Sequence, residues 1–420
     1  MKKLFIQAYN HPLIAGSSIV FIGSFIGNVL SYFFNLSMLR LLPVADYGLL
    51  TSLTSLLALI GILQLSLVGI FAKFSATYKA KKDEEGFAFL INSGIRFAVF
   101  ASLLLLLILL LLSPLLMTLT KSDDIILIFL ASISVSVALI FAFPVGILQG
   151  ELKFWKISFL NILSPVIKII VGVALVYIGY SVTGALLGVF TAALIPLFLG
   201  IYIIKKEHPR KNVKKVDTGV FLNEFKSYSA RFLLASIAIS VITNADILLV
   251  RGFFEPVVSG QYAALSLMGK AIFYLTSPIF FVFFPLIAQK DAKREKIKNT
   301  LYLTCGIVFL VSFNISAIYF LFPNLILAIF APNPSYQALI PFIGPFSLYI
   351  LVFSVANVFN NYFLSSGKTY IYKINVSIAI LFILLVIIFH SSLFQIIAVL
   401  FVCSILLLIL YLWNFFRHNE

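Results

Sequence analysis

Residues 94–117 read GIRFAVFASLLLLLILLLLSPLLM, an apolar run with a single charged residue, Arg96. A helix needs about 20 predominantly apolar residues to cross the hydrocarbon core of a bilayer. Residues 103–112 are all Leu or Ile, so every side of such a helix is apolar. Water cannot solvate this surface, and the run therefore predicts a membrane-spanning helix.

The rest of the chain repeats this pattern. Of its 420 residues, 62% are hydrophobic and 11% are charged, and the mean hydropathy is +1.11. A soluble domain carries about 25% charged residues. The pattern predicts an all-α polytopic membrane protein with about twelve transmembrane helices. The predicted spans are residues 13–36, 46–71, 90–117, 124–148, 157–178, 182–204, 228–251, 260–288, 300–322, 336–364, 370–389 and 393–415. The first is too long for a signal-peptide core, and the proline-rich residues 323–341 are interpreted as a helix end and a turn.

Positive charges alternate between the loops. Loops on one side hold 23 Lys and Arg residues, whereas those on the other side hold only Arg40, Lys121 and Arg251. Because positive loops stay in the cytoplasm, both termini are predicted to be cytoplasmic. The net charge of +15 is therefore explained by membrane orientation, and nucleic acid is not an expected partner.

The longest connection, about residues 205–227, divides the chain into halves with six predicted helices each. We predict an N-terminal lobe at 1–210 and a C-terminal lobe at 211–420. Two short stretches of the first half resemble stretches of the second half at an offset of 217 residues. Leu148-Gln149-Gly150 corresponds to Ser365-Ser366-Gly367, and Phe154-Trp155-Lys156 corresponds to Ile371-Tyr372-Lys373. Six helices per half give both lobes the same orientation, so a pseudo-twofold axis along the membrane normal is expected. Chance similarity between apolar sequences is the alternative.

Ionisable residues inside membrane spans are costly and usually face a cavity, a partner or the interface. Arg96 and Arg231 lie near cytoplasmic helix ends, where snorkelling to the headgroups is the simpler explanation. Lys168 lies near the middle of its span, and a cavity position is an even alternative. Asp246 and Lys270 lie on neighbouring helices, either as a structural pair or as a coupling acid and a substrate-binding cation.

Uncharged polar residues also occur within the spans. Amide side chains can bind sugar hydroxyls, but they equally stabilise helix–helix contacts. The candidate cavity residues of this kind are Asn28, Asn35, Asn244, Asn357 and Asn360.

Sequence patterns typical of enzymes and metal sites are missing. There is no GxSxG, HExxH or P-loop pattern, and every loop is short. Cys305 and Cys403 form no metal-binding or disulfide motif. We therefore expect a non-enzymatic protein with no metal site.

Three motifs carry a family resemblance. They are Leu42-Pro43-x-x-Asp46-Tyr47-Gly48, then Asn244-x-Asp246-Ile247-Leu248-Leu249-Val250 followed by Gly260-x-Tyr262-Ala263-Ala264, and Gly367-Lys368 after a long helix. In this order and spacing the chain resembles the Wzx-type polysaccharide-biosynthesis flippases of the MOP superfamily, which includes MATE and MurJ proteins.

The resemblance implies two six-helix lobes and a cavity that opens alternately to each side. The implied substrate is an undecaprenyl-diphosphate-linked oligosaccharide for O-antigen or capsule assembly, moved across a bacterial plasma membrane. Four span cations, Arg96, Lys168, Arg231 and Lys270, suit a diphosphate. No cofactor is expected beyond H⁺ or Na⁺ coupling through Asp246. Membrane lipids and other polysaccharide-assembly proteins are the expected partners of a monomer.

Two alternatives remain open. A MATE-type exporter of cationic drugs or metabolites would need acidic cavity residues, and Asp246 is the only acid away from the ends of the predicted spans. An integral polysaccharide polymerase or ligase would need a large outer loop with catalytic residues.

Overall fold

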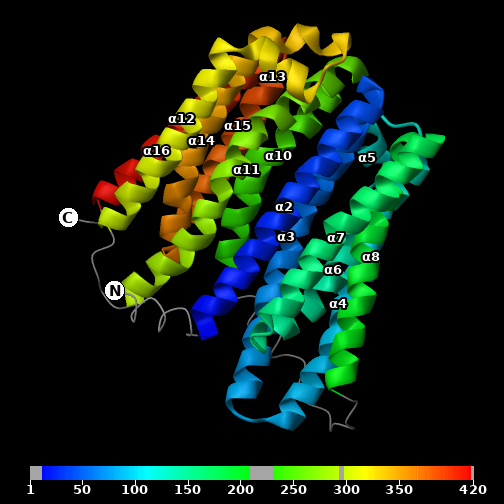
Figure 1. Cartoon of the computed structure of the whole chain (residues 1–420), viewed down its shortest axis with the longest axis vertical. Coiled ribbons are helices and arrows are strands. Elements are labelled where there is room, and N and C mark those ends of the chain that lie inside the picture. The colour runs from blue at the N-terminus through cyan, green and yellow to red at the C-terminus, as the bar shows by residue number, and fades with distance from the viewer. Residues whose placement is uncertain (1–11, 209–229, 293–297, 367, 418–420) are drawn as a thin grey trace. The chain divides into compact units, whose positions relative to one another are not determined.

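The computed structural model describes residues 12–208, 230–292, 298–366 and 368–417. Every regular element in these ranges is helical (Figure 1). The long helices are α2 Pro12–Leu41, α3 Val44–Ala80, α4 Glu84–Leu111, α6 Ile125–Gly150, α7 Phe154–Leu175, α8 Ser181–Glu207, α10 Ala230–Phe253, α11 Pro256–Ala292, α12 Lys298–Leu321, α14 Ile340–Ser365, α15 Tyr372–Ile388 and α16 Leu393–Arg417. The prediction of an all-α polytopic fold is confirmed, because one such helix forms the larger part of each predicted span.

Polar residues cap two of these helices. Asp83 caps α4 by accepting a hydrogen bond from the Gly86 amide at 2.8 Å. Asp124 caps α6 in the same way, with the Ile126 amide at 2.8 Å. A short π-helical segment, η1 Val176–Tyr180, links α7 to α8 and is kinked at Gly179, whose φ of 107° glycine adopts without steric cost.

Several boundaries differ from the prediction. The span predicted at 90–117 ends at Leu111, and a separate helix α5, Ser113–Thr120, follows with Pro114 in its first turn. The proline-rich residues 323–341 form two short helices, α13 Pro323–Phe330 and η3 Pro334–Leu339, rather than a simple turn. Helices α3 and α11 have 37 residues each. At 1.5 Å per residue they are about 55 Å long, more than the hydrocarbon core of about 30 Å.

The first of two compact units comprises Met1–Ser37, Ile60–Thr118 and Ser122–Ala230. Within it α6 packs against α4 and α8, and α7 packs against α8. Phe71 and Phe143 meet edge to face at the centre of its core, with ring centroids 5.4 Å apart. Leu90 and Ile147 are fully buried around them.

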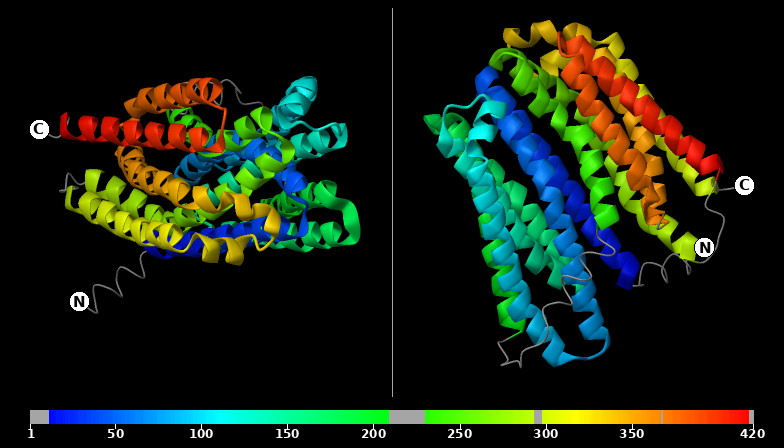
Figure 2. Two further views of the ribbon diagram at one scale, coloured as in Figure 1. Left: turned by 90° about the horizontal axis from the view of Figure 1, so that it is seen from above. Right: turned by 180° about the vertical axis from the view of Figure 1, so that it is seen from behind.

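The second unit comprises Met38–Leu59, Leu119–Lys121 and Arg231–Glu420. Here α14 packs against α11, α12 and α16, and α16 also runs along α15 (Figure 2). Aromatic rings fill the space between α14 and α16. Phe415 lies 5.9 Å from Phe359 and 5.6 Å from Tyr362, measured between ring centroids.

Residues 38–59 group with the second unit. A Cβ atom on Gly260 would overlap the Val44 carbonyl, so α3 and α11 are in backbone contact there. Arg251, 3% exposed, donates hydrogen bonds to the carbonyls of Thr120 at 2.7 Å and Ala45 at 3.3 Å. The predicted 210–211 boundary itself lies outside the described residues.

Candidate functional site

The first unit contains a polar cavity of about 290 Å³. Its walls come from α2, α3, α6, α7 and α8, all of them apolar spans. The lining residues are Ser24, Gly27, Asn28, Ser31, Gln64, Ala138, Phe141, Asn161, Ser164, Pro165, Ala192 and Ala193. None of these twelve residues is charged.

Small residues bring α2 and α7 together beside the cavity. A Cβ atom on Gly23 would lie 2.5 Å from Cβ of Ser158, and one on Gly27 would lie 3.1 Å from the Asn161 carbonyl oxygen. The Gly23-x-x-x-Gly27 spacing therefore acts as a close-packing motif. Pro165 follows Asn161 by four residues and has no amide N–H. The Asn161 carbonyl therefore lacks the hydrogen bond that it would accept in a regular helix.

Three amide side chains from three helices line this cavity: Asn28 on α2, Gln64 on α3 and Asn161 on α7. Within the described residues none of the three takes part in a side-chain hydrogen bond. Asn35, the other predicted amide of α2, bonds to the Ser31 carbonyl of its own helix at 2.9 Å and does not line the cavity. Asn28 and Asn35 have a similar position in the sequence pattern, but only Asn28 lines the cavity.

Lys168 lies on the same face of α7 as Asn161 and Ser164, at spacings of seven and four residues. Its Nζ atom lies over the Phe34 ring, 4.7 Å from the centroid, and Phe34 is 1% exposed. Among the described residues Lys168 has no acidic partner. Its charge is therefore stabilised in an apolar span by a cation–π contact with Phe34.

In the second unit Asp246 is 1% exposed on α10. Its Oδ2 atom accepts a hydrogen bond from the Tyr262 hydroxyl at 2.9 Å, whereas Oδ1 is buried without a partner in the described part of the chain. Lys270 interacts with this carboxylate electrostatically, but no salt bridge joins the two described side chains. The structural pair considered from the sequence is thus not formed as a direct contact.

The remaining amide candidates of this unit are mostly engaged within the protein. Asn244 donates to the Ser240 carbonyl at 3.2 Å. Asn360 accepts from Asn375 Nδ2 at 3.0 Å and from the Tyr411 hydroxyl at 3.2 Å. Asn357 is 9% exposed and has no side-chain bond to the described residues. Asn360 thus belongs to a buried network that joins α14, α15 and α16.

Of the two arginine candidates, the structure describes only the side chain of Arg96. Arg96 is exposed on α4 and does not line the polar cavity, a position compatible with snorkelling. The side chain of Arg231 lies outside the described residues. Their assignment as substrate-binding residues stays a prediction.

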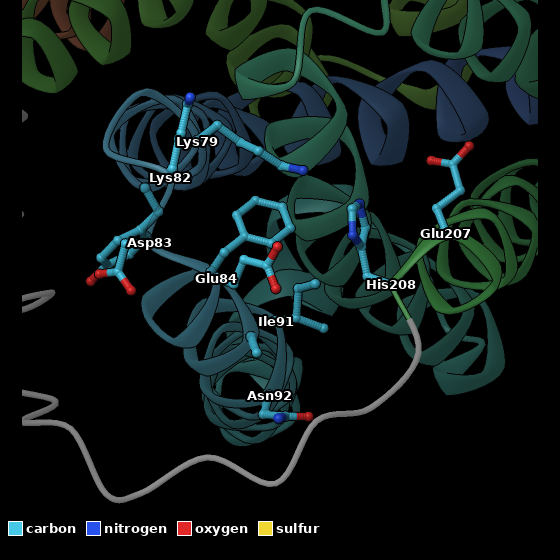
Figure 3. A pocket seen from close by; sticks show the side chains of 11 residues that line it. Lys79, Lys82, Asp83, Glu84, Ile91, Asn92, Glu207 and His208 are labelled. Atoms are coloured by element: carbon cyan, nitrogen blue, oxygen red, sulfur yellow. The ribbon is translucent and has the colours of Figure 1, made fainter.

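A second cavity of the first unit, about 500 Å³, lies between the ends of α3, α4 and α8. Lys79 and His208 point toward one another there (Figure 3). Glu151 is their common partner: one of its oxygens lies 2.9 Å from Lys79 Nζ and 3.0 Å from His208 Nε2. Lys153 bonds to the other oxygen at 2.8 Å. This ion network joins the ends of α3, α6 and α8 that the loop charges predict to be cytoplasmic.

The network shifts the pKa of its members in opposite directions. Burial acts to raise the pKa of the Glu151 carboxyl, but hydrogen bonds from Lys153, Lys79 and His208 outweigh burial and hold it below its ordinary value. Burial acts to lower the pKa of Lys153, but its bonds to Glu151 and Glu207 outweigh burial and raise it. Glu151, Glu207 and His208 could together face a metal ion. Lysines already neutralise both carboxylates, so an ion network is the better interpretation.

Sequence reasoning missed three residues that the structure brings forward. Gln64 is an isolated amide in a long apolar span, and that isolation was the available signal. Asn161 shares a helix face with Lys168, so its spacing could have found it. Arg251 was treated as an outer-loop charge, but it is buried and holds backbone carbonyls together.

Solved structures of other proteins have a similar arrangement of helices. An inward-facing multidrug resistance transporter of the MATE family, in the MOP superfamily, has a TM-score of 0.75 at 13% identity, with 94% of each chain covered. A MOP superfamily transporter from Pyrococcus furiosus, described as having a binding pocket of reverse polarity, has a TM-score of 0.60 at 14% identity, covering 96% of this chain and 95% of that one. These similarities show a MATE-like fold.

The sequence gives the family. The model of the family described as "Polysaccharide biosynthesis protein" matches residues 13–291, and the chain belongs to that family. The chain is also 27% identical over 198 residues to an uncharacterized membrane protein of Methanocaldococcus jannaschii. That match covers 44% of this chain and 47% of the relative, so it spans about half of the relative's length. The chain is therefore a multi-pass membrane protein of this family with a MATE-like fold.

Proposed function

We propose that this protein flips a lipid-linked oligosaccharide from the cytoplasmic to the outer leaflet of a bacterial plasma membrane, by alternating access, for surface polysaccharide assembly. The observation that carries the proposal is Lys168. A cation without an acidic partner in an apolar span favours an anionic ligand, because charge in a low-dielectric site is stable only when it is neutralised. A diphosphate supplies that charge, and polysaccharide biosynthesis supplies lipids that carry it.

The test is transport by the complete chain in proteoliposomes. The probe is a fluorescent short-chain polyprenyl diphosphate that bears one N-acetylhexosamine. We expect Lys168→Met to slow its movement at least about tenfold, since a charge-assisted contact contributes about 1.5–3 kcal/mol. Lys168→Arg keeps the positive charge and should retain most of the rate. Lys205→Met is the matched control, because Lys205 is an exposed cation at the end of α8. Equal rates in Lys168→Met and the control would refute the proposal.

A second candidate function, a MATE-type ion-coupled exporter, is favoured by Asp246. A buried carboxylate with one unpartnered oxygen could exchange H⁺ or Na⁺ with the cytoplasm or the outside. In the flippase the same residue would couple transport to an ion gradient, with Lys270 as its nearby charge. Export of an organic cation that does not depend on Lys168 would favour the exporter. Other polysaccharide-assembly proteins are proposed partners of a monomeric transporter.

A further inference from the structure

The polar cavity of the first unit has a hydrogen-bonding capacity that the protein leaves unused. Asn28, Gln64 and Asn161 each present an amide oxygen and an amide nitrogen, and none is bonded to a described residue. Ser24, Ser31 and Ser164 add hydroxyl groups to the same lining. Polar groups inside an apolar span are normally paired, so this cavity is built for contents that form hydrogen bonds.

Most amides elsewhere in the spans behave differently. Asn35, Asn244 and Asn361 each donate to a carbonyl of their own helix, at 2.9, 3.2 and 2.8 Å. Asn360 and Asn375 bond to one another at 3.0 Å. Bonds within one helix or between two helices therefore account for these five residues, but no such bond accounts for the three cavity amides, which come from three different helices.

The chemistry of the lining limits the ligand. With no charged residue in its walls, the cavity has nothing to neutralise an anion or a cation. It offers donors and acceptors together, which hydroxyl and acetamido groups of a sugar can match. Phe141 supplies an apolar surface for the C–H face of a pyranose ring. The volume of 290 Å³ equals roughly ten water molecules at about 30 Å³ each, which is space for a ligand of sugar size.

Lys168 relates this cavity to the proposed substrate. Asn161 and Lys168 lie on one face of α7, seven residues apart, or about 10 Å along the axis. In a lipid-linked oligosaccharide the first sugar is bonded directly to the diphosphate. A cation and an uncharged polar cavity on one helix face match that order of groups.

We infer that this cavity binds the sugar next to the diphosphate, through Asn28, Gln64 and Asn161, and so makes the transporter select glycosylated over bare lipid diphosphate. The inference rests on the proposed function, because Lys168 must hold the diphosphate. It assigns sugar recognition to uncharged groups of the first unit and lipid-diphosphate affinity to the cation.

The experiment measures the affinity of the complete chain in nanodiscs for two probes, a short-chain polyprenyl diphosphate with and without one N-acetylhexosamine. The quantity of interest is the ratio of the two dissociation constants. We expect wild type to prefer the glycosylated probe, and Gln64→Met or Asn161→Leu to reduce this preference by roughly tenfold. Lys168→Met should weaken both probes and leave the ratio unchanged. Asn314→Leu is the amide control, because Asn314 is exposed on α12 and bonds to the Leu310 carbonyl.

The possible failures are distinct. If the cavity variants leave the ratio unchanged while Lys168→Met weakens both probes, the cavity holds only water or packing space. The inference is then wrong and the proposed function stands. If wild type binds neither probe, or if Lys168→Met changes neither affinity, the proposed function fails and the inference fails with it.

Discussion

Each unit has a group of polar residues within its spans, and the two groups differ in their hydrogen bonding. In the second unit Asn360, Asn375 and Tyr411 bond to one another, with Tyr411 donating to the Asn375 oxygen at 2.6 Å. In the first unit Asn28 and Gln64 line a cavity and have no partner among the described residues. The amide type is the same, so its function depends on whether the fold supplies a partner. Closed networks stabilise helix packing, whereas open ones are available to a ligand.

The largest expected effect concerns the hydrogen-bond network of Asn360, Asn375 and Tyr411 in the second unit. Asn375→Leu removes bonds to Asn360, to Tyr411 and to the Ala235 carbonyl. We expect the free energy of unfolding to fall by about 2 kcal/mol, since interhelical hydrogen bonds in membranes contribute about 0.6–1.7 kcal/mol each. Thermal unfolding of the detergent-solubilised protein measures it. A loss no larger than that of Asn414→Leu, whose side chain bonds only within α16, would contradict the network.

The next effect concerns the buried acid of the second unit. Tyr262→Phe leaves the Asp246 carboxylate without its hydrogen bond, and Tyr262 is itself fully buried. We expect a loss of about 1.5 kcal/mol, because a hydrogen bond to a charged group contributes about 1.5–3 kcal/mol. Adding Asp246→Asn to the Tyr262→Phe variant should recover part of this loss, since the charge is then gone. An additive double mutant, measured by the same unfolding assay, would show that the two residues are not coupled.

A smaller effect concerns the ion network around Glu151, which is a closed polar cluster in the first unit. Glu151→Gln should lower stability near pH 7 by about 1 kcal/mol, since its lysine partners are partly exposed. The lowered pKa of Glu151 means that wild type gains stability above the ordinary glutamate pKa and loses it as the pH falls through the lowered value. The raised pKa of Lys153 has the opposite sign: its contribution is complete below the ordinary lysine pKa and is lost as the pH rises through the raised value.

Stability curves against pH measure this prediction. Wild type should show a plateau between an acid limb from Glu151 and an alkaline limb from Lys153, and Glu151→Gln should flatten both limbs. Lys205→Met, an exposed change at the end of α8, should leave the plateau intact. Identical acid limbs in wild type and Glu151→Gln would show that the network has no linkage to folding.

The smallest expected effect concerns Gln64, one of the unpaired amides of the polar cavity. Gln64→Met has nearly the same volume and breaks no hydrogen bond to a described residue. We expect the free energy of unfolding to change by less than about 0.5 kcal/mol, or to rise, because an unpaired amide is removed from an apolar span. A loss comparable with that of Asn375→Leu would mean that Gln64 stabilises the fold.

Local composition was enough to predict the helical fold. A run such as residues 94–117 can only be solvated by lipid, and lipid permits only structures that pair their backbone internally, so the class of fold and the number of spans follow from the sequence. The ends of α3 and α11 could not be predicted as well, because helices continue beyond the bilayer where hydropathy no longer marks them. Pro114 and Gly179 mark breaks whose geometry depends on neighbouring helices.

The candidate site depended much more on tertiary structure. Sequence patterns identified Lys168, Asp246 and Asn28 as unusual for a membrane span, because polar groups in hydrocarbon are costly wherever they lie. They could not distinguish Asn28 from Asn35, since both are amides on one helix. Only the packing of α2 against α7 at Gly23 and Gly27, and the position of Gln64 on α3, decides which amides remain unpaired. Hydrogen-bond satisfaction depends on neighbours distant in sequence, and it separates a ligand-binding amide from a structural one.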